Sequence, residues 1–417
     1  MPDVRRHAVG RTRLESQEDL DAFASLVEAI DSLSLRHTGV EPLADYVRHL
    51  ELPYVSGVHG RVDDPEDLED MEPVATILRE CQAVKTLECK GMAALCVLLH
   101  ARQTWFLPEL EALVVREFQA GLSMGRSTIF MAHLRRFPFL RRLVLHVRQR
   151  DRHAFSALVP STASTAVSSP ITSLCLQAGE SLGMQSAADF IADFARLTQL
   201  EITVTARVDL GRFLQACPVT LTALAIQLTD DRVEGEEIEP IHVEADLGRF
   251  VHLSTLKLGA CTYAPSCELF DVLCAHLPRL REVTLKRGTR LVADKVLNFV
   301  LARGGSSGSL EHLVLDSIVA VTDPLPSQNP NHPDVASGML DLSSWWGPPA
   351  WTPSFTLADA RALIAAAEHA GVQLEGSTVR AVEYDALLAR EEKYLLGRRD
   401  EVLEAVRGLF GEGDGEA

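Results

Sequence analysis

The sequence lacks the features of several functional classes. It holds 40 Lys and Arg against 58 Asp and Glu over 417 residues, a formal net charge of −18. A nucleic-acid-binding surface needs a basic surplus to neutralise phosphates, so this balance argues against a nucleic-acid partner. The longest apolar run, residues 92–99, is far shorter than the roughly 20 residues of a membrane-spanning helix. We therefore expect neither a nucleic-acid partner nor membrane contact.

Targeting and metal-binding signals are scarce as well. The N-terminal residues 1–7 are polar and charged, unlike the apolar segment of a secretory signal. The eight cysteines include no Cys-x-x-Cys pair and no paired spacing typical of a zinc site. In a reducing compartment they are most simply buried small apolar residues, with metal binding a distant second interpretation. We expect a cytoplasmic or nuclear protein without a metal or a cofactor.

Catalytic motifs are nearly absent. The chain has no phosphate-binding loop, no His-Glu-x-x-His and no calcium-loop spacing, and its 14 histidines are scattered singly. The segment 304–308, Gly-Gly-Ser-Ser-Gly, matches the nucleophile elbow of hydrolases, which needs a strand before the serine and a helix after it. Here a helical pattern precedes it and a strand pattern follows. We therefore interpret the segment as a turn, with Ser306 not a nucleophile.

What the chain does contain is a repeated hexamer: apolar, two residues, apolar, one residue, apolar. It occurs ten times, from a first copy at Val47 to a last one at Leu310, at an average interval of about 29 residues. The copies span residues 47–52, 84–89, 110–115, 140–145, 171–176, 197–202, 221–226, 253–258, 280–285 and 310–315. One hexamer means little when 47% of residues are hydrophobic, but ten in series define a repeat.

A helical pattern precedes the hexamers, as in residues 187–194, where apolar residues recur at three- and four-residue spacing. Pro108, Pro138 and Pro278 each lie two residues before a hexamer. Proline lacks the amide hydrogen that a helix needs, so it separates helix from strand. Each unit is therefore predicted to be a helix, a stop, a short strand and a loop.

The hexamer, the period and the preceding helix resemble leucine-rich repeats over residues 47–320. The resemblance implies an α/β fold: a curved solenoid of about ten irregular repeats, with a parallel sheet on its concave side and helices on its convex side. It predicts that Leu143, Leu174, Leu200, Leu224 and Leu256 are all buried.

The proline register and the uneven repeat length also resemble fungal F-box/leucine-rich-repeat proteins. In that family the F-box docks to a cullin-type ubiquitin ligase and the repeats bind the substrate, so the resemblance implies a cullin-adaptor protein as a partner. Residues 1–46 hold no F-box-like helical segment rich in Leu and Pro. They are predicted to form a degenerate N-terminal capping repeat.

Three segments follow the repeats. Residues 321–356 are rich in proline and hold Trp345, Trp346 and Trp351, which either pin this loop over the last repeat or bind a partner. Residues 357–410 are predicted to be a helical cap, with a helix to His369, a stop at Gly371 and one further strand at 372–374. Residues 411–417 are predicted to be a disordered tail.

The remaining candidate site is the concave face, where the third and fifth places of each hexamer and the residue after it point away from the core. This face comprises His49, Glu51, Thr86, Glu88, Lys90, Arg116, Arg142, His146, Gln177, Gln199, Glu201, Gln227, Lys257, Glu282, Thr284, Lys286, His312 and Asp316, interspersed with Val114, Val144 and Val314. Eight of them are predicted to contact a partner: Arg116, Arg142, His146, Gln177, Gln199, Glu201, Lys257 and Lys286.

Arg116, Arg142 and His146 are predicted to form the densest positive patch of this face, which suits an acidic partner segment. The acidic run from Asp63 to Glu72 offers a competing, intramolecular occupant for the same patch. The favoured function is a monomeric, non-enzymatic scaffold for protein recognition. An enzyme with a site built from noncontiguous loops and a purely structural solenoid remain alternatives.

Overall fold

The structure is a computed structural model. It describes residues 11–32, 43–54, 71–91, 97, 107–118, 134, 137–147, 169–178, 191, 194–205, 210–229, 244–259, 269–286, 293–305, 308–316, 357–380, 382–383, 385–386, 390 and 401. The chain divides into two compact units, the first comprising Met1–Thr262 and Cys267–Leu280 and the second Tyr263–Ser266 and Arg281–Ala417.

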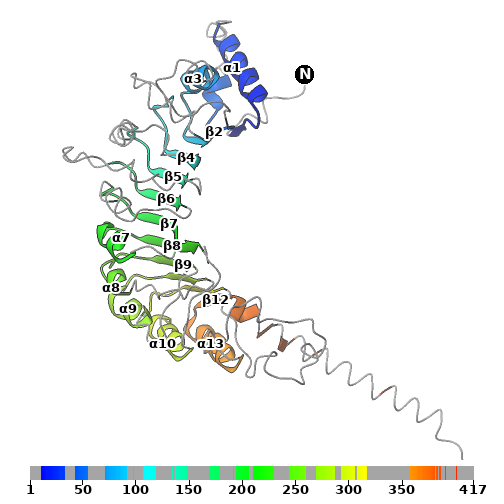
Figure 1. The fold of residues 1–417 in the computed structure, drawn as a ribbon. Helices are drawn as coiled ribbons and strands as arrows, with labels where there is room; N and C mark the ends of the chain where they lie inside the picture. The colour runs from blue at the N-terminus through cyan, green and yellow to red at the C-terminus, as the bar shows by residue number, and fades with distance from the viewer. Residues whose placement is uncertain are drawn as a thin grey trace, which may run out of the picture. The chain divides into compact units, whose positions relative to one another are not determined.

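Nine described strands of the first unit form a parallel ladder in sequence order, each pairing with the next (Figure 1). They are β1 Arg11–Arg13, β2 His49–Leu52, β3 Thr86–Lys90, β4 Ala112–Phe118, β5 Arg142–Val147, β6 Ser173–Ala178, β7 Gln199–Thr205, β8 Ala223–Thr229 and β9 Thr255–Gly259. Strands β2 to β9 are the first eight predicted hexamers, and β1 adds a strand before the first of them.

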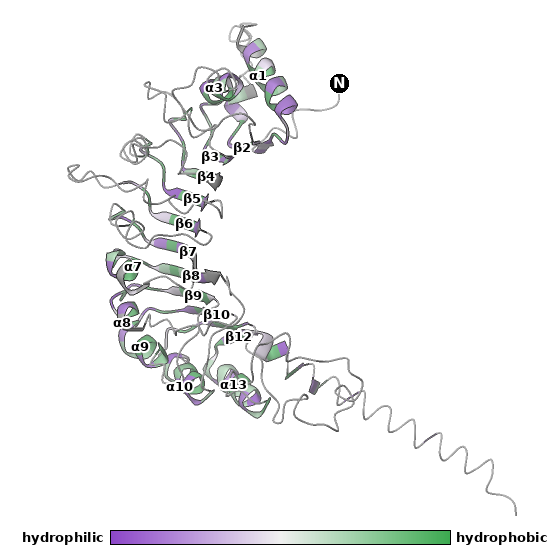
Figure 2. Cartoon of the chain, in the orientation of Figure 1, coloured by the Kyte–Doolittle hydropathy of each residue, from purple (hydrophilic) through white to green (hydrophobic). Residues whose placement is uncertain are grey.

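The described helices of this unit are α1 Gln17–Ser32, the 3₁₀ helix η3 Leu43–Tyr46, α3 Glu72–Glu80, α7 Leu210–Ala216, α8 Glu244–Leu247 and α9 Leu269–His276. Helices α7, α8 and α9 follow one another along one side of the strand ladder (Figure 1). The α7, α8 and α9 ribbons carry both apolar and polar residues, as expected for helices that pack one face on a core (Figure 2).

The second unit repeats this pattern with three described strands, β10 Glu282–Leu285, β11 His312–Leu315 and β12 Gln373–Gly376, paired in parallel in that order. Its described helices are α10 Ala293–Arg303 and α13 Leu357–Ala370. Helix α13 ends before Gly371, whose φ of +67° is readily adopted only by glycine, and β12 follows at once. The predicted strand after this helix is thus present.

The leucine positions build the core. Leu143, Leu174, Leu200, Leu224 and Leu256 all have at most 2% of their surface exposed, so the predicted burial of these five residues is confirmed. The first and last places of the hexamers are buried in the same way, from Val47 onward. Both units therefore have the α/β architecture of a leucine-rich-repeat solenoid.

Backbone hydrogen bonds add a second ladder beside the strands. The carbonyl of Arg48 accepts the amides of Lys85 and Thr86, at 2.8 and 3.0 Å, from the next repeat. In the repeats of β3 to β8, the carbonyl at the second hexamer place, from Lys85 to Thr222, likewise accepts two backbone amides of the next repeat. Each repeat therefore fixes the register of its successor before the strand itself begins.

The Gly-Gly-Ser-Ser-Gly segment has the predicted order of elements, with α10 before it and β11 after it. A nucleophile elbow needs the reverse order. Gly304 lies tightly against the end of α13, where an added Cβ would come within 2.6 Å of the Ala370 Cβ. Ser306 itself lies outside the described residues, so the helix-to-strand order is what argues against the hydrolase motif.

Several predicted features lie outside the described residues. They include the Pro/Trp-rich loop 321–356 with Trp345, Trp346 and Trp351, the tail 411–417 and most of the acidic runs around 63–72 and 230–246. Much of the predicted 357–410 cap beyond residue 380 lies outside them too. Within the described residues, no helix combines the length and hydrophobicity needed to cross a membrane.

Candidate partner-binding surface

The strand register places the predicted surface residues in rows, on the sheet face opposite the leucine core, which we call the open face. The third-place row of the first unit reads Arg11, His49, Thr86, Ala112, Arg142, Ser173, Gln199, Ala223 and Thr255. The fifth-place row reads Arg13, Glu51, Glu88, Val114, Val144, Cys175, Glu201, Ala225 and Lys257. Neighbours in a row come from neighbouring strands.

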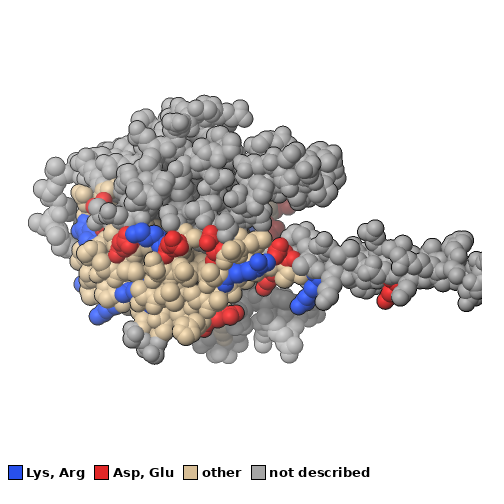
Figure 3. All heavy atoms as spheres, turned by 90° about the horizontal axis from the view of Figure 1, so that it is seen from below, with Lys and Arg blue, Asp and Glu red and all other residues tan. Residues whose placement is uncertain are grey.

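The open face of the first unit differs from the whole chain in charge. Its described basic residues are Arg11, Arg13, Lys90, Arg116, Arg142 and Lys257, and its described acidic residues are Glu51, Glu88 and Glu201. The chain as a whole has the opposite balance, at −18. By contrast, acidic and basic side chains lie interspersed on the face seen in Figure 3. The described open face of the first unit therefore carries more basic than acidic residues, opposite in sign to the whole chain.

Burial sharpens this difference. Glu51 and Glu88 are only 4% and 6% exposed, whereas the side chains of Arg11, Arg13 and Arg116 are 64%, 53% and 49% exposed. The repeat pattern predicted Glu51, Glu88 and Arg116 on the face that points away from the core, and the strand register agrees, but the two glutamates are buried on that face rather than solvated. The arginines that pair with them lie over the sheet and cover the carboxylates, so solvent meets guanidinium groups first.

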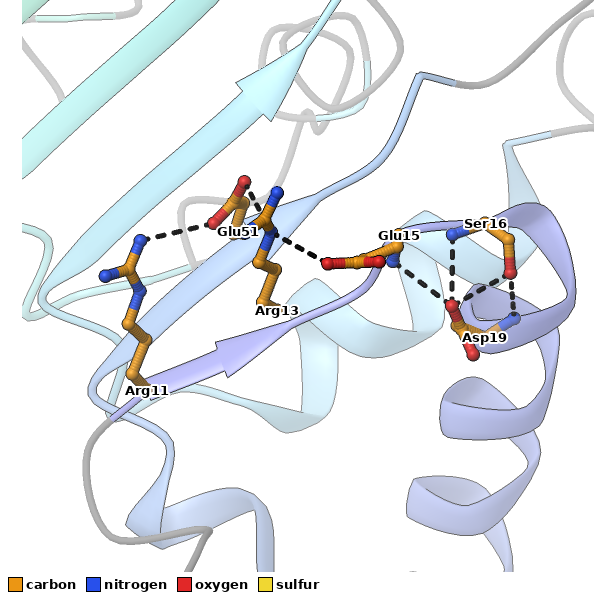
Figure 4. Close-up of polar contacts among 6 residues, drawn as sticks. All are labelled: Arg11, Arg13, Glu15, Ser16, Asp19 and Glu51. Carbon is orange, nitrogen blue, oxygen red and sulfur yellow. Dashed lines mark hydrogen bonds and ion pairs between the residues drawn. The ribbon is translucent and has the colours of Figure 1, made fainter.

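Glu51 sits between two arginines from the edge strand β1 (Figure 4). Arg11 Nη2 donates a hydrogen bond to Glu51 Oε2 at 3.3 Å, and Arg13 Nε lies 3.2 Å from Glu51 Oε1. Arg13 also lies 3.3 Å from Glu15, just before helix α1. The carboxylate of Asp19 accepts hydrogen bonds from Ser16 at the start of that helix, which lowers the pKa of Asp19.

Arg116, a residue of the predicted positive patch, is paired with Glu88. Its Nε lies 2.5 Å from Glu88 Oε1, in an ion pair without good hydrogen-bond geometry. Because Glu88 neutralises Arg116, the patch is less positive at this residue than predicted from the sequence. The strand register puts Glu88 opposite Val114, two residues before Arg116 on the same face of β4, so the arginine reaches the carboxylate diagonally.

His146 and Arg142, the other two residues of the patch, both lie on β5. Burial lowers the pKa of the half-buried His146, and Arg116 lowers it further. The imidazole is thus neutral at pH 7 and can donate or accept a hydrogen bond. Arg142 is exposed and stands in register with Ser173.

The other predicted contacts spread along the ladder. Gln177 on β6 is half-buried, while Gln199 and Glu201 on β7 and Lys257 on β9 are exposed. Lys286 is exposed at the end of β10, in the second unit. The first-unit residues share the open face, and Lys286 belongs to the corresponding face of its own unit.

Sequence reasoning missed Arg11 and Arg13. The segment around them was predicted to be a degenerate repeat, and alternation within that strand would have placed both arginines on the open face. The open face of the first unit thus begins one strand earlier than predicted.

The second unit carries its own surface pairs, with His312 3.4 Å from Glu375 and Arg380 2.9 Å from Asp316.

Cys175 is the open-face residue that most resembles a nucleophile, and its surroundings make it unreactive. Burial raises the pKa of its thiol to about 12, and the neighbouring Glu201 carboxylate contributes in the same direction. Since the thiolate is the reactive form, a thiol with this pKa is a poor nucleophile at neutral pH. Cys175 is therefore not a candidate nucleophile of the described open face.

No protein-family model matches the chain, and no curated protein does. Among solved structures, the chain is similar to internalin C2 of Listeria monocytogenes, at 15% identity and a TM-score of 0.31, over 58% of this chain and 83% of that one. It is also similar to a chain of the yeast Rad7–Elc1 complex, at 13% identity and a TM-score of 0.33, over 76% of this chain and 82% of that one. The assignment to the leucine-rich-repeat fold rests on the strand ladder and the buried leucines themselves.

Proposed function

We propose that this protein is a recognition scaffold that binds a protein partner on the open face of its first unit. The observation that carries the proposal is the exposed basic character of this face in a chain of net charge −18. A parallel sheet with one face packed on leucines leaves the other free to present side chains at regular spacing. Extended protein surfaces are recognised in this way without any catalytic group.

An acidic segment is the partner chemistry that fits. Arg142 is exposed on β5, with Arg116 and His146 beside it on β4 and the same strand β5. Arginine binds carboxylates with two parallel hydrogen bonds, which gives both affinity and orientation. Hot spots cluster near the centre of an interface, and β5 is the middle strand of the nine-stranded ladder. Arg142 is therefore the residue expected to matter most.

A role as substrate receptor of a cullin-type ubiquitin ligase is the more specific form of this proposal. It is supported by the resemblance of the repeats and their prolines to those of fungal F-box/leucine-rich-repeat proteins. In that arrangement a cullin-adaptor protein is a second partner, and the open face takes the substrate. The adaptor contact would then lie outside the Arg142 region.

The test is quantitative affinity purification with the full chain as bait, comparing wild type with Arg142→Glu. A partner of the open face is enriched on wild type and lost on Arg142→Glu, and its purified form binds Arg142→Ala about 1–3 kcal/mol more weakly. Its affinity also falls as salt is raised. Co-purification of cullin-adaptor proteins with both baits supports the ligase role.

The matched control is Arg196→Glu, which makes the same charge change at an exposed turn residue before β7. Loss of the partner on both variants assigns the effect to net charge and contradicts a site at Arg142. Retention of every partner on Arg142→Glu, at unchanged salt dependence, removes this patch from the site. Absence of cullin-adaptor proteins from all baits contradicts the ligase role and leaves the scaffold role.

A further inference from the structure

The middle of the open face holds an apolar strip that is three strands wide. In the fifth-place row, Val114, Val144 and Cys175 stand side by side on β4, β5 and β6. Val144 is 5% exposed, and the other two side chains are half-buried. The Cys175 thiol, with a pKa of about 12, carries no charge at neutral pH. Neighbouring strands lie about 4.8 Å apart, so the outer two strands of the strip are roughly 10 Å apart.

Charged residues bound this strip on both sides. The same row continues to Glu88 on β3, which is paired with Arg116, and to Glu201 on β7, which is exposed. The apolar strip is therefore centred on β5 and extends one strand to either side. A carboxylate placed on the strip would lose water without gaining a hydrogen bond, whereas an apolar side chain is stabilised by the same burial.

Along β5 the strip lies between two polar side chains. Arg142, Val144 and His146 alternate with two core leucines of this strand and so share the open face. Residues two apart on a strand are separated by about 6.6 Å, so Arg142 and His146 lie at about this distance on either side of Val144. A hydrogen-bond donor, an apolar side chain and a second donor thus follow one another at equal spacing along one strand.

Neither polar side chain is held by a hydrogen bond or an ion pair within the described residues. The other described open-face arginines of the first unit are all ion-paired: Arg11, Arg13 and Arg116. Arg142 is exposed and has no such pair with a described residue, and the His146 imidazole has no hydrogen bond with one. The register between β4 and β5 also shifts between Val115 and Phe118, beside His146. Such an irregularity bends a strand and re-aims its side chains, and it is common next to active sites.

We propose that this part of the open face binds an extended protein segment along β5, with the pattern acidic, any residue, apolar, any residue, acidic. The inference rests on the proposed function, because it specifies the partner of the same face. In an extended segment, alternate side chains share one face and repeat at about 6.6 Å, which is the spacing of Arg142, Val144 and His146. A segment lying across the strands would meet side chains about 4.8 Å apart and would lose this match.

The pattern assigns one contact to each of its three positions. One carboxylate pairs with Arg142, in the two-hydrogen-bond geometry that guanidinium groups favour. The apolar side chain lies on Val144 and covers the exposed parts of Val114 and Cys175. The other carboxylate accepts a hydrogen bond from His146. Because the pattern reads the same in both directions, parallel and antiparallel segments can make these contacts.

The test is fluorescence anisotropy of labelled synthetic peptides titrated with the full chain. The matching peptide holds Glu-Ser-Leu-Ser-Glu between Gly-Ser flanks, and the control peptide holds the same residues in the order Glu-Glu-Ser-Ser-Leu. The matching peptide should bind at least about tenfold more tightly than the control peptide, although their net charges are equal. A third peptide with serine in place of the leucine should bind about tenfold more weakly than the matching one, because the apolar burial is lost.

Two variants of the protein assign the contacts. Arg142→Ala should weaken binding of the matching peptide about tenfold, and His146→Ala about threefold to tenfold. Both variants should also reduce the preference for the matching over the control peptide. Lys257→Ala is the matched control, because Lys257 is an exposed basic residue of the same face on β9. It should bind the matching peptide as wild type does.

Equal binding of the matching and the control peptide overturns the proposed pattern, and so does a lack of binding of both. The proposed function is then decided separately by the co-purified partner. A partner that is lost on Arg142→Glu but binds through a segment without this pattern contradicts the inference and leaves the proposed function in place. Equal weakening by Arg142→Ala and Lys257→Ala assigns the binding to overall charge and contradicts both.

Discussion

Strands β1–β4 and β6–β9 share one kind of apolar core and differ at the second hexamer place and in the burial of their fifth-place glutamates. At the second hexamer place the early repeats carry charged residues, and Lys85 and Glu111 pair at 2.7 Å on the surface. The later repeats carry hydroxyls there: Thr198, Thr222 and Ser254 each donate to the carbonyl of the preceding repeat at 2.9–3.1 Å. The backbone hydrogen bonds at the second place are thus accompanied by a surface ion pair in the early repeats and by hydroxyl hydrogen bonds in the later ones.

The open face divides in the same way. Its fifth place holds the buried Glu51 and Glu88 in the early strands, whereas the charged fifth-place residues of the later strands, Glu201 and Lys257, are exposed. Because the leucines are buried alike in both regions, the fold does not depend on these polar choices. The apolar rows therefore specify the solenoid, while the polar rows determine the charge and the hydrogen-bonding groups of each part of the surface.

The largest effect should come from the core and be equal in the two regions. Leu87→Ala and Leu200→Ala each remove a side chain that is at most 2% exposed. We expect each to lower the free energy of unfolding by about 2–5 kcal/mol, as measured by urea denaturation. A loss of unfolding free energy several times larger in one region than in the other would contradict a shared core.

The next effect concerns the end of β3, which stops before Gly91, whereas β7 and β8 run on to Thr205 and Thr229. Gly91 has a φ of +78°, and an added Cβ would lie 2.9 Å from the Tyr54 ring. Gly91→Ala should cost about 1–3 kcal/mol of unfolding free energy.

Gly371→Ala is the control for that substitution. Gly371 has a similar φ of +67° with no atom near the added Cβ, so only the backbone cost of about 1–2 kcal/mol applies. A smaller loss for Gly91→Ala than for Gly371→Ala would show that the Tyr54 contact carries no cost.

The hydroxyl ladder should give a smaller effect that salt does not change. Thr222→Val keeps the shape of the side chain and removes the donor to the Thr198 carbonyl, which still accepts two backbone amides. We expect a loss of about 0.5–1.5 kcal/mol in thermal or urea unfolding. The same loss should be found at low and at high salt, since no charge is involved.

The smallest effect should come from the exposed pair at the equivalent place in the early repeats. A double-mutant cycle on Lys85 and Glu111 should give a coupling of about 0.2–1 kcal/mol, because both side chains are about half exposed. This coupling should shrink as salt is raised. A salt-independent coupling larger than that of Thr222 would reverse the proposed difference between the two kinds of support.

The sequence predicts the fold well because the residues that repeat in the hexamers are the ones that form the buried core. Leu143 and Leu256 could be assigned to the core from spacing alone, and the strand after Leu310 from its hexamer. The contacts of the candidate site could not be predicted from spacing in the same way. Which glutamate lies beside Arg116 depends on the register between β3 and β4, and no local pattern encodes that pairing.

The edge strands show the same limit. Arg11 and Arg13 belong to a strand of three residues without a full hexamer, so periodicity alone could not align it with β2. Burial of Glu51 then follows from its arginine neighbours rather than from its own position in the hexamer. Non-repeated contacts of this kind need coordinates.

The most direct test of the recognition role is the affinity of a purified partner for wild type, Arg142→Glu and Arg196→Glu, measured at two salt concentrations. We expect Arg142→Glu to weaken binding by at least about tenfold and to lower its salt dependence, while Arg196→Glu matches wild type. Equal affinities and equal salt dependence for all three proteins would contradict a binding site on the open face at β5.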